Sequence, residues 1–202
     1  MRRNLGLEVV LVGLVIALGA VTWDLSYVVG QEPAGHHDEG VIMLHNTVAT
    51  VVVALGVVLA AVGARWLLLE RPATRQAYAL FAASTLLFAD GVLHFYVVSE
   101  HLSILPFAVF FVVAGAAQIL LGFGLMRPRP LVYYLALVTT IGLIGLFFLS
   151  RTITMPFAEG PEEYDAIGLL SKALEGMTIV ALGVLLYRWR TAAKVEEPKP
   201  AD

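Results

Sequence analysis

The sequence contains no cysteine. Disulfide bonds, thiolate metal sites and cysteine nucleophiles are therefore excluded, and any metal site would have to use histidine, carboxylate or backbone ligands. Charged residues are also scarce, at 14% of the 202 residues, whereas 59% are hydrophobic. Soluble domains carry about 25% charged residues. A chain with so few charges cannot cover a water-facing surface, so we expect an integral membrane protein.

The sequence also lacks the short motifs that mark common enzyme classes. It contains no P-loop, no dinucleotide-binding glycine pattern, no HExxH and no GxSxG. The alternating pattern of a membrane β-barrel strand is absent as well, and helices and closed barrels are the only structures that satisfy their backbone in lipid. The sequence therefore predicts an all-α fold, a polytopic transmembrane helical bundle.

Six apolar runs of about 20 residues, bounded by charges or prolines, predict six transmembrane helices. Their short connections favour antiparallel packing of consecutive helices. The first run is longer than the apolar core of a signal peptide, so we expect it to remain as a span. We expect one transmembrane domain over residues 1–190 and a disordered cytoplasmic tail over 191–202. The predicted spans lie near 7–29, 41–69, 76–98, 105–126, 131–149 and 167–187.

The basic residues predict an orientation in the membrane. If the N-terminus is cytoplasmic, eleven of the thirteen lysines and arginines fall on the cytoplasmic side, which follows the positive-inside rule. Both termini are then cytoplasmic, in a multi-pass protein of the cell membrane. The same residues are explained as topology signals, so we expect the lipid bilayer and no nucleic acid as a partner. These residues are Arg2, Arg3, Arg65, Arg71, Arg75, Arg127, Arg129, Arg188, Arg190, Lys194 and Lys199.

The outer side has the opposite character. Its first and third connections, at residues 31–40 and 150–165, are rich in acidic residues. All five histidines fall in outer loops or in the outer halves of spans. This asymmetry favours a site on the outer side of the bundle. The five are His36, His37, His45, His94 and His101.

The third predicted span carries a stripe of ionisable side chains. Asp90 and His94 are four residues apart, and His94 and His101 seven. At 3.6 residues per turn the three side chains lie within about 40° of one another, provided that the helix continues past Val98. Asp90 lies on the order of 12 Å below the outer end. An unpaired carboxylate at that depth is costly, so we expect Asp90 to be neutral, paired or metal-bound.

Four of the six spans contribute an ionisable residue to the outer half of the membrane, and bundles build cofactor sites from such facing side chains. Imidazole and carboxylate ligands suit copper or zinc. We therefore predict a metal site for metal handling, or for a subunit of a membrane oxidoreductase. Its predicted ligands are His45, Asp90, His94, His101 and Glu175, its charged neighbours Asp24, Lys172 and Asp165, and its capture loop His36, His37, Asp38 and Glu39.

Other interpretations of the same residues stay open. Lys172 could pair with one of the two buried acids in a purely structural contact, with the other acid protonated. A b-type haem with His45 and His94 as axial ligands is a second hypothesis. A proton- or cation-coupled transporter using Asp90, Lys172 and Glu175 is a third. A structural subunit of a membrane complex, or a homo-oligomer, is a fourth, and the sequence names no substrate.

One segment resembles a group of uncharacterised prokaryotic multi-span membrane proteins. Those chains carry a His, then Glu-His and an apolar span that ends in Ala-Gln, followed by Ser-Arg-Thr, a Pro and a late Glu. The resemblance covers roughly the C-terminal 110 residues and implies no function. Asp90 and His94 with the further His101 also look like the ligand set of a membrane copper monooxygenase subunit, by analogy alone. The matching positions are His94, Glu100, His101, Gln118, Ser150, Arg151, Thr152, Pro156 and Glu175.

Overall fold

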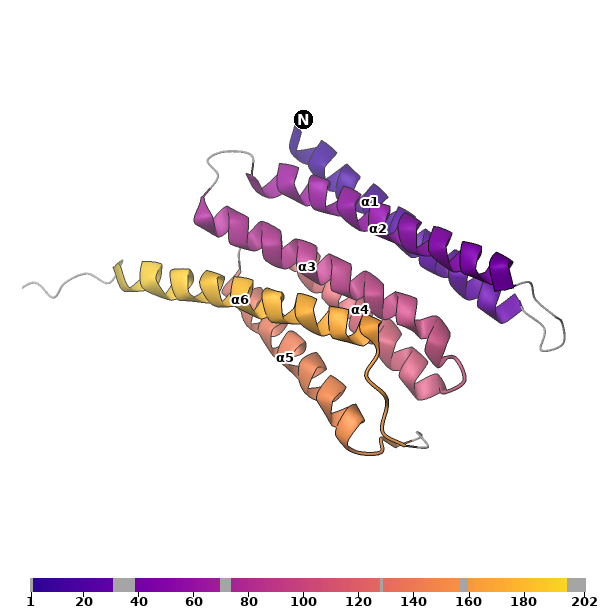
Figure 1. Ribbon diagram of the computed structural model, residues 1–202. Coiled ribbons are helices and arrows are strands. Elements are labelled where there is room, and N and C mark those ends of the chain that lie inside the picture. The colour runs from indigo at the N-terminus through magenta and orange to yellow at the C-terminus, as the bar shows by residue number, and fades with distance from the viewer. Residues whose placement is uncertain (1, 31–38, 70–73, 128, 157–159, 196–202) are drawn as a thin grey trace, which may run out of the picture.

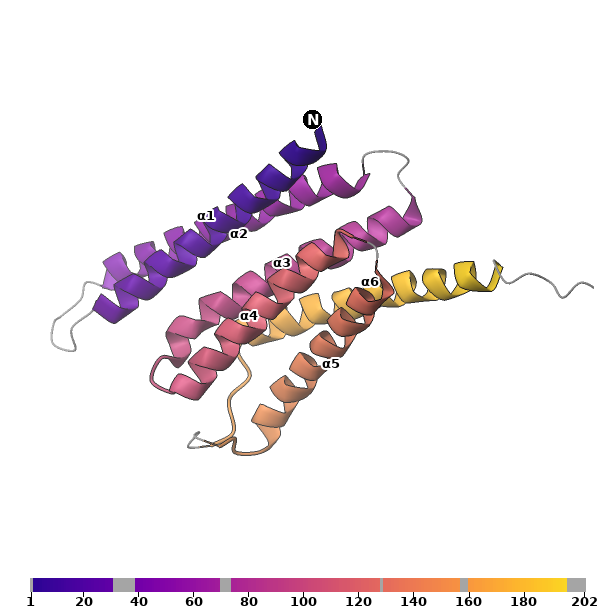
Figure 2. The same cartoon turned by 180° about the vertical axis from the view of Figure 1, so that it is seen from behind.

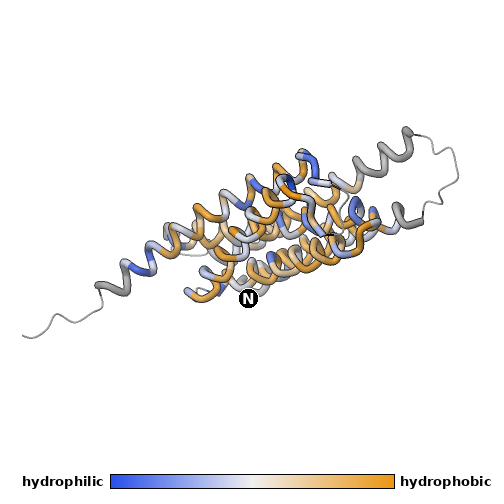
Figure 3. Tube along the Cα trace, turned by 90° about the horizontal axis from the view of Figure 1, so that it is seen from below, coloured by the Kyte–Doolittle hydropathy of each residue, from blue (hydrophilic) through white to orange (hydrophobic). Residues whose placement is uncertain are grey.

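The computed structural model describes residues 2–30, 39–69, 74–127, 129–156 and 160–195, and within them the fold is all-helical, as predicted. Each of the six helices holds a stretch long and apolar enough to cross a membrane, and apolar residues dominate the helices in Figure 3. These are the candidate spans of a multi-pass membrane protein. The helices are α1 (Arg2–Gly30), α2 (Glu39–Leu69), α3 (Arg75–Val97), α4 (Leu105–Leu125), α5 (Pro130–Thr152) and α6 (Ala166–Val195), with a 3-10 turn, η1 (Val98–His101).

The six helices correspond to the six predicted spans, and several of them run beyond the predicted ends. The third span does not stop near Val98, because η1 continues it to His101. The last helix runs on to Val195, so residues 191–195 of the expected tail are helical. The remainder of that tail, 196–202, lies outside the described residues.

Local sequence signals explain several helix starts. Thr74 precedes α3, and its hydroxyl accepts a hydrogen bond from the Ala77 amide at 3.1 Å. Asp165 precedes α6 and accepts one from the Gly168 amide at 2.5 Å. Both are N-caps, which satisfy amides that the first helical turn leaves unpaired. Pro106 and Pro130 lie in the first turns of α4 and α5, where a missing amide proton costs nothing.

α3 is the central helix of the bundle. It packs against α1, α2, α4 and α6, whereas α5 packs against α4 and α6. Successive helices alternate in direction, so the connections gather at two ends (Figures 1 and 2). We call the end where α3 and α5 finish, and α4 and α6 begin, the His101 end.

Two helix pairs approach closely through glycines. A Cβ on Gly56 of α2 would lie 2.5 Å from the Ala17 nitrogen of α1, and one on Gly91 of α3 would lie 2.9 Å from the Gly115 oxygen of α4. Small residues at such positions let helix backbones meet and maximise packing in a membrane. The close α3–α4 contact matters for the site, because it places α4 directly against the acidic part of α3.

The apolar core is divided between two places. One cluster joins α1, α2 and α3, with Val10, Leu14 and Phe88 among its buried members. The other joins the start of α3 to α5 and α6 through Leu80, Tyr133 and related residues. The second cluster seals the bundle at the end opposite His101. Many large apolar side chains face outward, Val15 and Leu120 at 69% and 70% exposure among them, as lipid-facing surfaces do.

Candidate functional site

A cavity of about 660 Å³ opens at the His101 end, between α3, α4, α5 and α6. α3 and α5 share the apolar cluster at the opposite end of the bundle, and at the His101 end the cavity lies between them. Its wall is largely apolar and aromatic, with Phe107, Phe110 and Phe111 from α4 and Phe147 from α5. α4 and α5 meet near their short connection and diverge towards the His101 end in both views (Figures 1 and 2).

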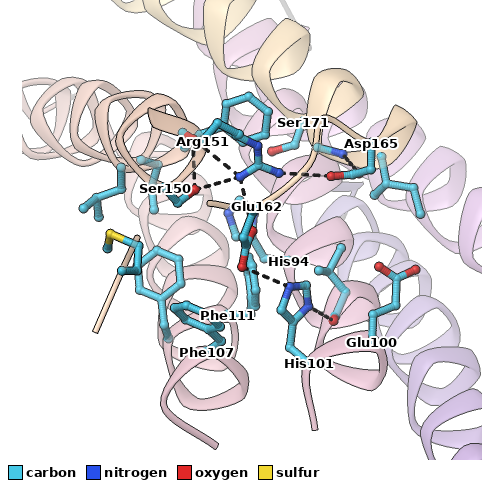
Figure 4. A pocket seen from close by; sticks show the side chains of 18 of the residues that line it. His94, Glu100, His101, Phe107, Phe111, Ser150, Arg151, Glu162, Asp165 and Ser171 are labelled. Atoms are coloured by element: carbon cyan, nitrogen blue, oxygen red, sulfur yellow. Dashed lines mark hydrogen bonds and ion pairs between the residues drawn. The ribbon is translucent and has the colours of Figure 1, made fainter. Parts of the chain in front are cut away.

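Two histidines of the predicted stripe lie on the cavity wall. His94 Nδ1 lies 2.9 Å from the Asp90 carbonyl oxygen, and His101 Nδ1 lies 3.1 Å from the Val97 carbonyl oxygen. In both rings Nδ1 therefore donates to the carbonyl one turn earlier, which leaves Nε2 as the acceptor nitrogen of the neutral ring. Both rings pack near Phe111, with centroid distances of 6.0 and 4.7 Å. The stripe thus places on the cavity wall two imidazoles that are held through Nδ1 in the same way (Figure 4).

Arg151 lies across the cavity and connects α5 to the segment before α6. Its guanidinium donates to Glu162 at 3.4 Å, to Asp165 at 3.0 Å and to the Ser150 hydroxyl at 2.9 Å. It also stacks over Phe147, 3.7 Å from the ring centroid. The Glu162 amide donates to the Ser150 carbonyl at 2.9 Å. These contacts fold residues 160–165 over the cavity (Figure 4).

Glu162 links the two sides of the cavity. One carboxylate oxygen accepts from Arg151, and the other, Oε1, lies 3.7 Å from His101 Nε2. That separation is too long for a good hydrogen bond. His101 Nε2 and Glu162 Oε1 are therefore two acceptor atoms that face the same small space.

Deeper in the bundle, four helix-borne side chains form a buried polar cluster from α3, α4 and α6. Gln118 donates to Asp90, and Lys172 donates to Glu175 at 2.5 Å. The carboxyls of Asp90 and Glu175 also interact with each other. Asp90, Gln118 and Glu175 are at most 1% exposed. His94 and Lys172 belong both to the cavity wall and to the surroundings of this cluster.

The predicted metal ligands therefore fall into two groups. His94 and His101 line the cavity, whereas Asp90 and Glu175 lie in the buried cluster, with Asp90 Oδ1 3.9 Å from His94 Nδ1. In the described part of the chain, no group of three or more His, Asp or Glu side chains is arranged to hold a metal ion. The side chain of His45 lies outside the described residues, so the predicted ligand set as a whole stays a prediction, as does the haem hypothesis.

The predicted neighbours are placed as follows. Lys172 lies between cavity and cluster, and Asp165 pairs with Arg151 while it caps α6. Asp24 is buried on α1 and interacts electrostatically with Glu100 at the His101 end. The capture loop is not tested: His36, His37 and Asp38, and the side chain of Glu39, lie outside the described residues.

Sequence reasoning from spacing missed several residues of the site. Gln118 joins α4 to α3 by donating to Asp90, a contact that no spacing within one helix predicts. Arg151 and Glu162 belong to the acid-rich connection at 150–165, and their spacing along the chain does not relate them to the stripe on the third span. The resemblance did contain Gln118 and Arg151, but not Glu162. Six of its positions line the cavity, namely His94, Glu100, His101, Ser150, Arg151 and Pro156.

Comparison of the chain with family models, with curated proteins and with solved structures finds no match.

Proposed function

We propose that this multi-pass membrane protein binds a small lipid-soluble molecule in the cavity at the His101 end. The molecule carries hydroxyl groups, as a hydroquinone does. These hydroxyls donate hydrogen bonds to the Nε2 atoms of His94 and His101. The main support for this proposal is the state of the two imidazoles. Their Nδ1 atoms already donate to backbone carbonyls, so each Nε2 can accept a hydrogen bond from the ligand.

The shape and lining of the cavity favour an apolar body on that ligand. Pockets for small organic molecules measure about 300–1,000 Å³ and are mostly apolar with a few placed polar groups. The volume of about 660 Å³ and the four phenylalanines fit that description. Leu146 lines the cavity on α5 and is 40% exposed. Because α4 and α5 diverge at this end, a ligand could enter the cavity between them from the bilayer.

The orientation of the protein in the membrane is part of the same proposal. With eleven of thirteen basic residues on the opposite side, the His101 end faces away from the cytoplasm under the positive-inside rule. The cavity then samples the outer leaflet of the cell membrane.

The test is a titration of detergent-purified protein with decyl hydroquinone, in which binding is measured as a shift of the melting temperature. The dimethyl ether of the same compound cannot donate a hydrogen bond and serves as the matched ligand control. We expect His94→Ala and His101→Ala each to weaken hydroquinone binding about tenfold, the equivalent of one hydrogen bond. Equal binding of the two compounds, or unchanged affinity in both variants, would refute the proposed ligand.

A transition-metal ion, copper or zinc, is a second candidate. Metal-binding histidines usually donate their other ring N–H to a carbonyl or carboxylate, and both histidines here do so. Two atoms that each lie about 2.0–2.2 Å from one zinc ion are at most about 4.4 Å apart. The 3.7 Å between His101 Nε2 and Glu162 Oε1 fits a shared ion. His101 and Glu162 are therefore the pair of ligands that this spacing favours.

Leu146→Trp separates the two candidates. A large side chain on this half-open wall should block an organic ligand and leave a metal ion unaffected. Metal content is measured on purified protein beside His101→Ala, Glu162→Gln and the control Glu8→Gln, an exposed carboxylate on α1. Equal metal content in all four proteins would exclude the metal site.

A further inference from the structure

The buried cluster below the cavity contains three oxygen atoms that accept nothing from the protein. In the part of the chain that the structure describes, Asp90 Oδ1, Gln118 Oε1 and Glu175 Oε2 are buried and have no hydrogen-bond donor. Their residues come from three helices, α3, α4 and α6, and are 0–1% exposed. Buried polar atoms are nearly always partnered, so three in one cluster need an explanation.

The three residues are connected to one another. The Gln118 amide is directed at Asp90, to which it donates, and the Asp90 and Glu175 carboxyls interact across the α3–α6 contact. The close approach of α3 and α4 at Gly91 and Gly115 fixes this arrangement. The cluster is therefore built into the helix packing and does not depend on a loop.

The charges in the cluster do not balance while both carboxyls are ionised, because two carboxylates and one ammonium, that of Lys172, leave one negative charge in excess. The two acids are 1% exposed and the Lys172 side chain is 12% exposed. Burial of an unbalanced charge costs several kcal/mol or more. One additional positive charge would balance the cluster.

The number of free oxygens favours a metal cation over a proton. A proton on one carboxyl donates a single hydrogen bond, so it satisfies its own oxygen and one acceptor and leaves the third unpaired. A hard cation takes lone pairs from several oxygens at once. The excess of one negative charge matches a monovalent ion, because a divalent ion would leave the cluster positive.

We propose that Asp90, Gln118 and Glu175 bind one small monovalent cation of the sodium class at the centre of the bundle. The site is separate from the cavity and does not depend on the cavity ligand. Ser171 lies one turn before Glu175 on the cavity side of α6, and its buried hydroxyl has no partner in the described residues. It offers a further oxygen between the cavity and the cation.

The experiment uses the full-length protein in detergent at constant ionic strength and constant pH. Thermal unfolding is followed while NaCl replaces choline chloride. Binding of an ion to the folded state alone raises the melting temperature in a saturable way. We expect sodium to raise it by about 2–4 °C or more, the equivalent of about 1 kcal/mol in a chain of this size. The same titration is run on Asp90→Asn, Glu175→Gln and the matched control Glu100→Gln, an exposed carboxylate at the His101 end.

The expected result is a saturable sodium effect in the wild type and in Glu100→Gln, and loss of that effect in Asp90→Asn and Glu175→Gln. Isothermal titration with NaCl on the wild type gives a second, direct readout if either variant fails to fold. A wild-type melting temperature that does not respond to sodium would overturn the proposal. An equal sodium effect in all four proteins would also overturn it.

Discussion

Arg151 joins three parts of the molecule through one side chain. It is held by stacking on Phe147 within α5, and it pairs with Glu162 and Asp165 in the segment that leads to α6. Asp165 uses one oxygen for Arg151 and the other for the first turn of α6. A planar guanidinium can serve several acceptors in fixed directions, which an ammonium cannot. The position of Glu162 opposite His101 therefore depends on Arg151.

Replacing Arg151 should loosen the 160–165 segment without unfolding the helices. We expect Arg151→Met to speed amide exchange at Glu162 roughly tenfold, because the ion pairs that hold this segment are lost. Arg151→Lys should give an intermediate rate. Hydrogen-exchange mass spectrometry in detergent measures both, with α4 peptides as the internal control. Unchanged exchange in Arg151→Met would show that the backbone bond to Ser150 holds the segment alone.

Gln118 and Asp90 should be coupled in stability. Gln118→Ala removes the donor of a fully buried carboxylate, and we expect it to lower the free energy of unfolding by about 1–3 kcal/mol. In a double-mutant cycle with Asp90→Asn the two losses should fall short of additivity. Unfolding in mixed micelles measures all four proteins. Additive losses would contradict a direct contact between the two side chains.

At the scale of helices, sequence periodicity predicts some of the site and leaves out the rest for a physical reason. Asp90, His94 and His101 belong to one stripe because helical spacing is local, and η1 keeps His101 close to it. The placement of Arg151 and Glu162 depends on how α5 and α6 pack, which no local pattern contains. Gln118 meets Asp90 only because α3 and α4 approach closely at their glycines. The sequence therefore predicts which faces are polar, but not which polar faces meet.

The α1–α2 contact gives a direct test of helix packing. A Cβ on Gly56 would lie 2.5 Å from the Ala17 nitrogen, whereas one on Gly19 would meet nothing within 4 Å. We expect Gly56→Ala to lower the free energy of unfolding by about 1–3 kcal/mol through overpacking. Gly19→Ala, the matched control on α1, should be neutral or slightly stabilising. Equal effects of the two substitutions would mean that the close contact does not form.

At the scale of the whole molecule, the two ends of the bundle differ in how they are packed. The end opposite His101 is sealed by packed apolar side chains, whereas the His101 end holds an open, largely apolar cavity whose wall carries histidine, arginine and carboxylate side chains. The basic residues gather near the sealed end. The charge distribution and the packing thus agree on two chemically distinct ends, which the proposed orientation assigns to the two sides of a membrane.

That orientation can be tested because the chain has no cysteine of its own. Ser103 lies in the exposed turn between η1 and α4, and Thr191 is exposed near the end of α6. We expect a membrane-impermeant maleimide to label Ser103→Cys in intact cells, and Thr191→Cys only after permeabilisation. The wild-type chain is the blank. Labelling of Thr191→Cys in intact cells would reverse the proposed orientation.

The glycine contact between α1 and α2 has a consequence for biogenesis. These two helices pack closely along their lengths, while α1 touches the remainder of the described bundle only at α3 and η1. Their interface needs no residue from the later helices, so the hairpin can associate in the bilayer as soon as both spans have left the ribosome. The helices that enclose the cavity are synthesised afterwards and assemble against a hairpin that is already in place.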